Sequence, residues 1–379
     1  MRLGKLRTVQ WRNIEDGEIE FADGVNVLVG GNGQGKTNVI EAVHYLALGK
    51  SHRGARDDEL PRFGAEHFFV RGEGDGDAGD AFSIEAGFTP PRSKRIKVDG
   101  IAVTRLTDLA GVLACVSFGP EDAELARGAP QLRRRYLDYT LAETSRTSLK
   151  ALAEYRRVLQ QRGALLRGAR RGEIESALRV WDDELVTKGL EVTRRRAEAL
   201  LDLAPRAEQA HADLGGSEPL QLQYAVHATG KNFRAGEELA RALQDTTALH
   251  DAFAARLRER RIAEIARKVC LVGPHRDDIG LVVGERDLRR FGSQGQCRTA
   301  AVALKIAQAG FIRAQRRERP VVLLDDVFAE LDEKRSRCLW DVVCSEHQTI
   351  LAVPRQSDLQ FGAGDTVFRV DGGRLRREH

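Results

Sequence analysis

The chain has 379 residues, which is enough for two domains because single hydrophobic cores stop growing at about 250–300 residues. Its 42% hydrophobic content contains no apolar run close to the ~18 residues that a membrane span requires, and the N-terminal MRLGKLRTVQW lacks the apolar stretch of a signal peptide. The formal net charge of +4 is the difference between 60 basic and 56 acidic side chains, so the expected soluble, cytoplasmic protein can still carry separate charged patches.

The N-terminal part of the chain is predicted to alternate between strands and one helix. The segments LRTVQW, GEIEF and VNVLVG read as strands, and a helix is expected from about Asn38. Gly49 stands where a glycine commonly ends a helix. Further strands are expected over 65–105, where the Asp99-Gly100 pair in RIKVDGIAV predicts a tight hairpin.

The pattern changes to helix over residues 121–270. Two apolar stripes with helical spacing run from Leu149 to Leu166 and from Val186 to Ala204, on either side of a glycine-containing segment. These stripes predict a short helical hairpin, which could form either a bundle core or an exposed arm.

Strand patterns return near residue 270 with VCLVGPHRDDIGLVV, followed by a helix from about Gln296. The apolar run VVLLDD is typical of a strand buried on both faces, and TILAVP and TVFRVDGGRL predict late strands. We therefore expect an α/β head assembled from both chain ends, residues 1–120 and 271–379, with residues 121–270 inserted as a mainly helical lobe.

The segment GGNGQGKT (Gly30–Thr37) matches the phosphate-binding pattern GxxxxGK[ST] in full. Glycines allow backbone N–H groups to turn toward phosphates, Lys36 supplies a positive charge, and the Thr37 hydroxyl can bind Mg²⁺. The segment follows an apolar strand and opens a helix, whose N-terminal dipole also favours anions. A nucleotide-binding P-loop is predicted.

A P-loop needs an acidic group at the end of a buried strand to hold the metal ion. The run VVLLDD ends in Asp325, which is assigned to Mg²⁺, and Asp326, which is assigned to the attacking water.

The loop FGSQGQ (Phe291–Gln296) precedes a predicted helix that leads into the Asp325 strand. This order resembles the ABC-type ATPases, whose S-x-G-Q signature loop precedes such a helix, and Ala329–Asp332 resembles their D-loop. The resemblance implies that the signature loop contacts the nucleotide of a second copy, so that ATP joins two heads.

Several longer stretches resemble the RecF family of bacterial recombination-repair ATPases. They cover roughly half of the chain, include both of its ends and occur in the same order as in the family; they are Trp11–Arg53, KVDGIAVTRLTDLAG, Phe118–Asp138, Gly273–Gln308 and VVLLDDVFAELDEKR.

This resemblance implies an SMC-like ATP-binding head that forms an ATP-dependent homodimer and acts in DNA repair, recombination and replication under the SOS response. Its implied partners are double-stranded DNA near single-strand junctions and gaps, together with RecO and RecR, with which it helps to load recombinase. Hydrolysis of ATP with Mg²⁺ is expected to be weak and DNA-stimulated, and the protein to be associated with the nucleoid.

The resemblance also assigns residues. Those carried over to the nucleotide are Gly30, Gly31, Asn32, Gly33, Gln34, Gly35, Lys36, Thr37, Asn38, Arg12, Asn13 and, from a second copy, Ser293, Gly295 and Gln296. Thr37 and Asp325 are assigned to the metal, and Asp326 and Lys36 to catalysis.

Three features depart from the general ABC pattern. Asp326 replaces the usual glutamate, no glutamine is found around 116–120, and no histidine follows TILAVP. Two alternatives stay open. One is the nucleotide-binding subunit of an ABC transporter, against which the absent histidine and the long helical region 121–270 count, and the other is an ATP-binding clamp without significant hydrolysis.

Clusters of arginine are candidates for phosphate contacts, although for each cluster taken singly a solvated helix face is the more common explanation. The clusters are Arg133–Arg135, Arg194–Arg196, Arg258–Arg261 and Arg313–Arg317.

Overall fold

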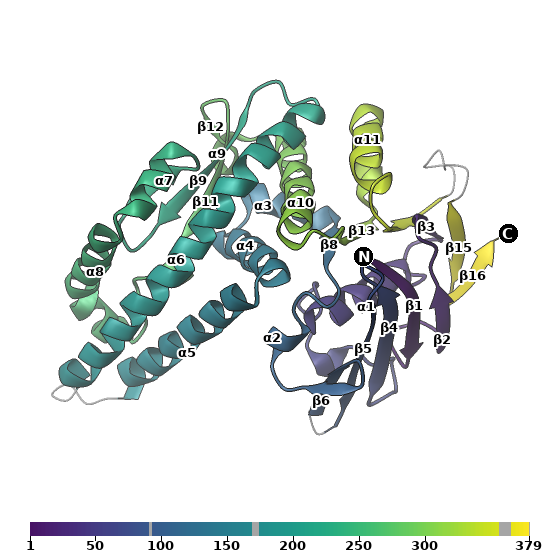
Figure 1. Cartoon of the computed structure of the whole chain (residues 1–379), viewed down its shortest axis with the longest axis horizontal. Helices are drawn as coiled ribbons and strands as arrows, with labels where there is room; N and C mark the ends of the chain where they lie inside the picture. Colours follow the sequence, from purple (N-terminus) through teal and green to yellow (C-terminus); the bar gives the residue numbers. More distant parts are fainter. Residues whose placement is uncertain (91–92, 169–173, 356–364, 379) are drawn as a thin grey trace. The chain divides into compact units, whose positions relative to one another are not determined.

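The computed structural model describes residues 1–90, 93–168, 174–355 and 365–378, which divide into two compact units (Figure 1). The first unit comprises Met1–Asp122, Asp213–Gly215 and Gln308–His379, and the second comprises Ala123–Ala212 and Gly216–Ala307. Both chain ends therefore belong to one unit.

The first unit is built on two sheets, each six-stranded in the described residues, with orders β2-β1-β4-β5-β6-β7 and β16-β15-β3-β14-β13-β8. Its elements are β1 Arg2–Val9, β2 Gly17–Glu20, β3 Val25–Val29, α1 Lys36–Leu48, β4 Phe68–Asp75, β5 Ala81–Thr89, β6 Ser93–Val98, β7 Ile101–Val103, α2 Leu106–Leu109, β8 Cys115–Phe118, β13 Val321–Asp325, α11 Glu333–Leu339, β14 Thr349–Val353, β15 Thr366–Asp371 and β16 Arg374–Glu378.

The sheet that carries the site is mainly parallel. Strand β3 pairs in parallel with β14 and β15, and β13 pairs in parallel with β14 and β8. Helix α1 contacts strands of both sheets, which explains why it is buried along most of its length. Parallel strands end at the same edge of a sheet, so the residues that follow β3 and β13 meet there.

The predicted turns in this unit are confirmed. Gly49 ends α1 in a left-handed conformation, with φ of 66°, and its N–H donates to the carbonyl of Tyr45. Asp99 and Gly100 both have positive φ, 50° and 78°, and join β6 to β7 as a tight hairpin.

The second unit combines helices with an antiparallel sheet of order β10-β9-β11-β12. Its elements are α3 Glu124–Arg127, α4 Pro130–Thr144, α5 Arg146–Gly168, α6 Ile174–Asp213, β9 Leu220–Val226, β10 Lys231–Arg234, α7 Glu237–Gln244, α8 Thr246–Arg267, β11 Asp278–Val283, β12 Arg286–Asp287, α9 Leu288–Phe291 and α10 Gln294–Arg316, which continues into the first unit.

Helices α5 and α6 correspond to the two predicted apolar stripes, and Leu152, Leu166, Val186 and Leu200 are buried. The turn predicted between them falls mostly on 169–173, outside the described residues.

The division into units differs from the predicted one between residues 271 and 307, which pack with the second unit. The reason is strand pairing: β11 forms an antiparallel ladder with β9, a strand inside the region expected to be mainly helical. In addition, VCLV at 269–272 is not a strand, and β11 begins only at Asp278.

Candidate functional site

The segment Gly30–Gly35 forms the loop between β3 and α1. A Cβ on Gly30 would lie 2.2 Å from the carbonyl oxygen of Val370, so a larger side chain cannot fit there. Gly35 has φ of 121°, and its Cβ would lie 2.8 Å from Ile14 Cδ1. Glycine is therefore required at both positions for steric reasons.

Three predicted site residues meet at the edge of the sheet. Lys36 is buried, and its Nζ donates to the carbonyl oxygens of Gly30 and Gly31 at 2.7 and 3.1 Å. The Thr37 hydroxyl donates to Asp325 Oδ1 at 3.0 Å. The P-loop and the end of β13 thus form one polar site from segments that lie at opposite ends of the chain.

The carboxyl group of Asp325 has a raised pKa. Burial raises its pKa to about 6, and the negative charges of Asp326 and Glu121 act in the same direction, whereas the hydrogen bond from Thr37 and the charge of Lys36 oppose the shift. Such an environment favours binding of a cation beside the carboxylate. The hydroxyl and carboxylate oxygens of Thr37 and Asp325 are the hard donors that fit Mg²⁺.

Asp326 differs from its neighbour in backbone conformation, with φ of 51° and ψ of 21°. Its Oδ1 is buried and has no hydrogen-bond partner among the described residues. A left-handed aspartate with an unsatisfied oxygen is costly unless it serves a function, so this position is a candidate for chemistry.

A cavity of about 290 Å³ lies beside Lys36, Thr37 and Asp326. The residues that line it are Asn32, Gly33, Gly35, Lys36, Thr37, Asn38, Arg53 and Asp326. Arg53 was not among the residues predicted for the site. It lies in the loop after α1, where no local pattern marks it, and its Nη1 lies 3.4 Å from Asn38 Oδ1.

The segment after β1 supports the P-loop from the side. Asn13 Nδ2 donates to the carbonyl of Gly33 at 3.1 Å, and Asn13 Oδ1 accepts from Asn38 Nδ2 at 2.7 Å. Arg12 forms a bidentate ion pair with the buried Glu41, both nitrogen–oxygen distances being 2.9 Å. The guanidinium group of Arg12 is thus held by Glu41 of α1. That Arg12 and Asn13 contact the nucleotide stays a prediction.

The hairpin formed by β15 and β16, with Gly372 and Gly373 at its turn, also contacts the P-loop. The N–H of Gly373 donates to the carbonyl of Gln34 at 2.9 Å, and the N–H of Gly372 donates to Gln34 Oε1 at 2.6 Å. A Cβ on Gly373 would lie 1.8 Å from the carbonyl oxygen of Asn13. Gln34 therefore faces the hairpin, a role that its place in the motif did not predict.

The predicted signature loop lies in the second unit, at the start of α10. Ser293 Oγ accepts from the N–H of Gln296 at 3.2 Å, and Gln296 Oε1 accepts from the N–H of Ser293 at 3.0 Å. This reciprocal pair is a capping box that fixes the helix start. Ser293 and Gly295 are exposed, so the end of the helix is available to a ligand or a second molecule.

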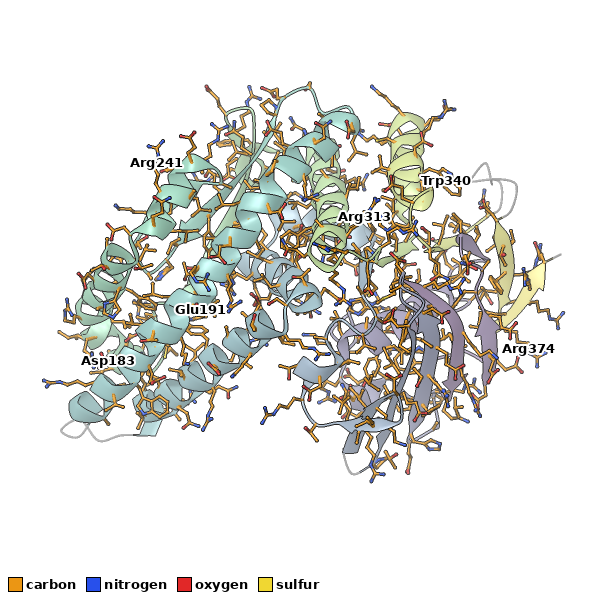
Figure 2. The ribbon with its side chains drawn as sticks, viewed as in Figure 1. Asp183, Glu191, Arg241, Arg313, Trp340 and Arg374 are labelled. Atoms are coloured by element: carbon orange, nitrogen blue, oxygen red, sulfur yellow. The ribbon has the colours of Figure 1, made fainter. Side chains whose placement is uncertain are left out.

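Two of the arginine clusters contain inward-facing members. Arg133 is 3% exposed and pairs with Asp278, and the buried Arg196 pairs with Asp138. Arg313, which is labelled in Figure 2, pairs with Glu346 within the first unit. In the fourth cluster Arg261 pairs with Asp182 and Arg260 with Glu259, so each of the four clusters includes arginines with protein partners, which is why arginine density alone does not locate a nucleic-acid surface.

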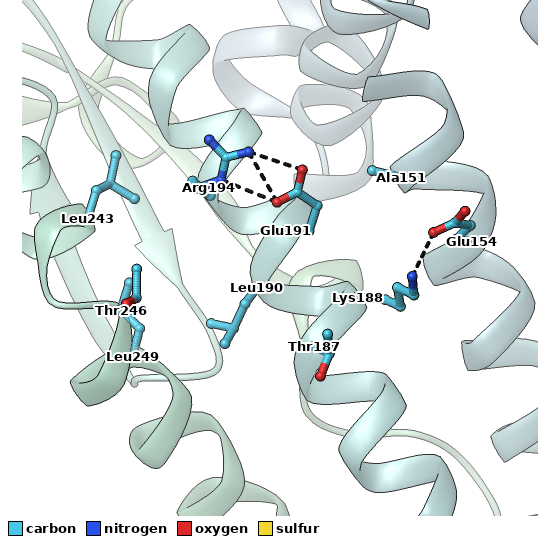
Figure 3. A pocket seen from close by; sticks show the side chains of 10 residues that line it. All are labelled: Ala151, Glu154, Thr187, Lys188, Leu190, Glu191, Arg194, Leu243, Thr246 and Leu249. Carbon is cyan, nitrogen blue, oxygen red and sulfur yellow. Dashed lines mark hydrogen bonds and ion pairs between the residues drawn. The ribbon is translucent and has the colours of Figure 1, made fainter. Parts of the chain in front are cut away.

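A second cavity of about 400 Å³ lies between α6 and the α7–α8 junction in the second unit (Figure 3). Leu190, Leu243 and Leu249 contribute to its wall, and the ion pairs Lys188–Glu154 and Arg194–Glu191 stand at its side. Its charged side chains are paired with one another, so it lacks converging charged groups of the kind that a catalytic site presents.

Comparison with known proteins assigns the family. The model of the RecF/RecN/SMC N terminal domain matches residues 2–371. The DNA replication and repair protein RecF of Heliobacterium modesticaldum is 37% identical over 100% of both chains. The chain belongs to the RecF family. The RecF protein of Acidothermus cellulolyticus is likewise similar, with 38% identity over 96% of each chain, and the transporter-subunit alternative is set aside.

Solved structures support the same assignment to the RecF family. The recombination mediator protein RecF, solved with ATP, matches with a TM-score of 0.90 and 28% identity over 100% of this chain and 97% of the other. An SMC head bound to the C-winged helix domain of ScpA matches with a TM-score of 0.55 and 15% identity, which bears on the fold alone. The predicted ABC-type ATPase head is confirmed. No helix among the described residues has the length and apolar character needed to cross a bilayer.

Proposed function

We propose that the protein is an ATP-dependent DNA-binding protein of recombinational repair. The observation that carries this proposal is that Lys36 and Thr37 line one cavity, with Thr37 hydrogen-bonded to Asp325, beside a glycine loop that tolerates no larger side chain at Gly30 and Gly35. Backbone N–H groups, a buried lysine and a helix N-terminus together suit a nucleoside triphosphate. The RecF relative solved with ATP supports ATP as the nucleotide.

The metal is expected to be Mg²⁺, held by Thr37 and Asp325, where it would neutralise phosphate charge. Lys36 binds the phosphates through its ammonium group. Asp326, whose Oδ1 has no partner among the described residues, orients the attacking water and accepts its proton. Because aspartate is one methylene shorter than glutamate, we propose that ATP hydrolysis is slow. We further propose that DNA stimulates this hydrolysis, and that hydrolysis sets how long the dimer stays closed.

The site is completed by a second copy of the chain. The support is the capped and exposed loop at Ser293, Gly295 and Gln296, which offers a helix N-terminus to an anion but belongs to the second unit, whereas the residues lining the cavity belong to the first. In this proposal ATP binds between the Lys36 side of one copy and the Ser293 side of the other, and dimerisation depends on nucleotide.

The dimer binds double-stranded DNA near single-strand junctions and works with RecO and RecR to load recombinase at gaps, as a nucleoid-associated cytoplasmic protein. The support is the RecF relatives, which are DNA replication and repair proteins, and the description of one solved relative as a recombination mediator of the RecFOR pathway.

A second candidate is an ATP-binding clamp in which occupancy alone drives closure. The left-handed backbone of Asp326 favours it, because this conformation could hold the carboxylate away from the water-activating position. The two candidates share the same binding steps and differ only in turnover.

The binding steps that both candidates share are tested by measuring molecular mass by size exclusion with light scattering, with and without ATP–Mg²⁺ and a gapped duplex. We expect a monomer without ATP, a dimer with ATP, and a dimer that co-elutes with the duplex. Lys36→Ala should remain monomeric and fail to bind a fluorescent ATP analogue. Dimerisation without ATP, or no dimer with it, would contradict the proposal.

A further inference from the structure

The loop Gly273–Asp278 (GPHRDD) joins α8 to β11, and most of its polar groups face the interior of the second unit. Asp277 is fully buried; it accepts from Tyr224 Oη at 2.6 Å and from the N–H of His227 at 2.9 Å. Asp278 forms a bidentate pair with Arg133, at 2.8 and 3.0 Å. The loop is therefore held firmly in place.

His275 adds a further constraint. Its Nε2 lies 3.1 Å from the carbonyl oxygen of Cys270, which can only accept, so Nε2 carries the proton and Nδ1 accepts from Tyr155 Oη at 2.6 Å. Burial lowers the pKa of His275 to about 4, which keeps the ring neutral. These bonds join the loop to α5 and to the end of α8.

Arg276 is the exception, because it is exposed. Its Nε lies 3.4 Å from the carbonyl oxygen of Cys270, the same acceptor that binds His275, so a hydrogen bond positions the guanidinium group of an otherwise exposed side chain. A buried network thus presents one arginine outward.

Helix α8 contributes two more arginines beside this loop. Its Phe253 packs under the loop, since a Cβ on Gly273 would lie 3.3 Å from Phe253 Cζ. Arg256 and Arg260 follow at a four-residue spacing, which places them on one helix face. Their side chains are 31% and 46% exposed.

One carboxylate stands between these arginines. Glu259 accepts from Arg256 at 3.0 Å and lies 3.6 Å from Arg260 Nε, so it holds the two guanidinium groups side by side. Burial lowers the pKa of His227, and the positive charges of Arg276, Arg256 and Arg260 act in the same direction. The three arginines therefore act on one common group, His227, and Glu259 is the carboxylate that pairs with Arg256 and Arg260.

We propose that Arg256, Arg260 and Arg276, here named the basic face, bind consecutive phosphates of the duplex DNA backbone. Guanidinium groups form bidentate hydrogen bonds with phosphate, and contacts of this kind read no sequence. The inference rests on the proposed function, which supplies DNA as the partner. It assigns part of the DNA surface to the second unit.

The test uses the full chain with ATP–Mg²⁺ and a fluorescent 30-base-pair duplex, with anisotropy measured over a range of salt concentrations. The variant is Arg256→Gln/Arg260→Gln/Arg276→Gln, which removes charge but keeps side-chain bulk. The slope of log K against log salt is negative, and each lost phosphate contact reduces its magnitude by about 0.9. We therefore expect the magnitude of the slope to fall by about 2–3 in the triple variant, with at least a ~10-fold loss of affinity at low salt. Glu259→Gln should change affinity in the opposite direction, because it removes the competing carboxylate.

The matched control is Arg241→Gln, at a 75% exposed arginine of α7 that pairs with Glu237 (Figure 2). It should leave both affinity and salt slope unchanged. Circular dichroism melting and binding of an ATP analogue establish that the triple variant is folded and competent for nucleotide.

The outcomes separate this inference from the proposed function. If the wild-type protein binds duplex and the folded triple variant binds equally well with the same slope, the basic face is not a DNA surface, whereas the proposed function stands. Binding of polyglutamate is measured alongside, as a probe for an acidic protein partner. If the variant keeps its DNA affinity but no longer binds polyglutamate, the basic face recognises acidic protein and the inference is wrong. If the wild-type protein binds no duplex with ATP, both proposals fail.

Discussion

The hydroxyl of Thr37 donates to Asp325 Oδ1 at 3.0 Å, and this bond joins the start of α1 to the end of β13. Between these two residues the chain builds the whole second unit. Despite this bond, burial and the negative charge of Asp326 raise the pKa of Asp325 to about 6, so a cation at this position would relieve repulsion between like charges.

Ser293→Arg should leave ATP binding unchanged and prevent ATP-dependent dimerisation, because an exposed arginine would block a loop proposed to contact a second copy. Nucleotide affinity and molecular mass would be measured on the same preparation. Ser293→Ala is the control: it loses the helix cap, at a cost of about 1 kcal/mol, without adding bulk. A Ser293→Arg protein that dimerises normally with ATP would exclude the two-copy site.

Asp326→Asn should retain ATP binding and dimerisation and reduce turnover by about 10²–10⁴-fold, the usual contribution of a general base. Phosphate release would be measured with and without duplex DNA. Asp325→Asn provides the contrast, since it should weaken Mg²⁺-dependent nucleotide binding itself. Unchanged turnover in Asp326→Asn would contradict the role given to Asp326, and negligible turnover in the wild type would favour the clamp without significant hydrolysis.

Gly373→Ala should destabilise the first unit and weaken ATP binding, because the new Cβ would lie 1.8 Å from the Asn13 carbonyl oxygen, next to the P-loop. Overpacking of about 1–3 kcal/mol adds to about 1–2 kcal/mol of backbone strain. Gly372→Ala is the matched control, since it shares the left-handed backbone but its Cβ would meet no atom within 4 Å. Urea melts and ATP titrations should separate the two variants, and equal losses would argue against the hairpin as a support of the P-loop.

Acidification should destabilise the second unit through His275. Its pKa is about 4 in the folded chain, against an ordinary value near 6.5, so the unfolded state takes up the proton first as the pH falls. The loss begins near pH 6.5 and is complete below about pH 4, with an upper size of about 3 kcal/mol. Urea melts at pH 7 and pH 4.5 should show a smaller pH dependence for His275→Gln than for wild type. An identical dependence would mean that His275 titrates normally.

Much of the nucleotide site was predictable because its signals are local. A strand, a glycine loop and a helix follow one another directly at Gly30–Thr37, and VVLLDD is apolar enough to indicate a buried strand. Arg53 and Gly373 were not predictable in this way, since each reaches the P-loop region only through tertiary packing.

Local sequence patterns were sufficient to predict most of the secondary structure, the P-loop, the two acidic residues at the end of β13 and the resemblance to the RecF family. Only the tertiary structure decided that residues 271–307 pack with the second unit, because the pairing of β11 with β9 depends on a partner strand that no local periodicity identifies. It also decided which arginines face inward, as Arg133 does, and which face outward, as Arg276 does. The sequence shows which side chains are charged, but packing between segments that are distant along the chain sets the partner and the exposure of each charged side chain.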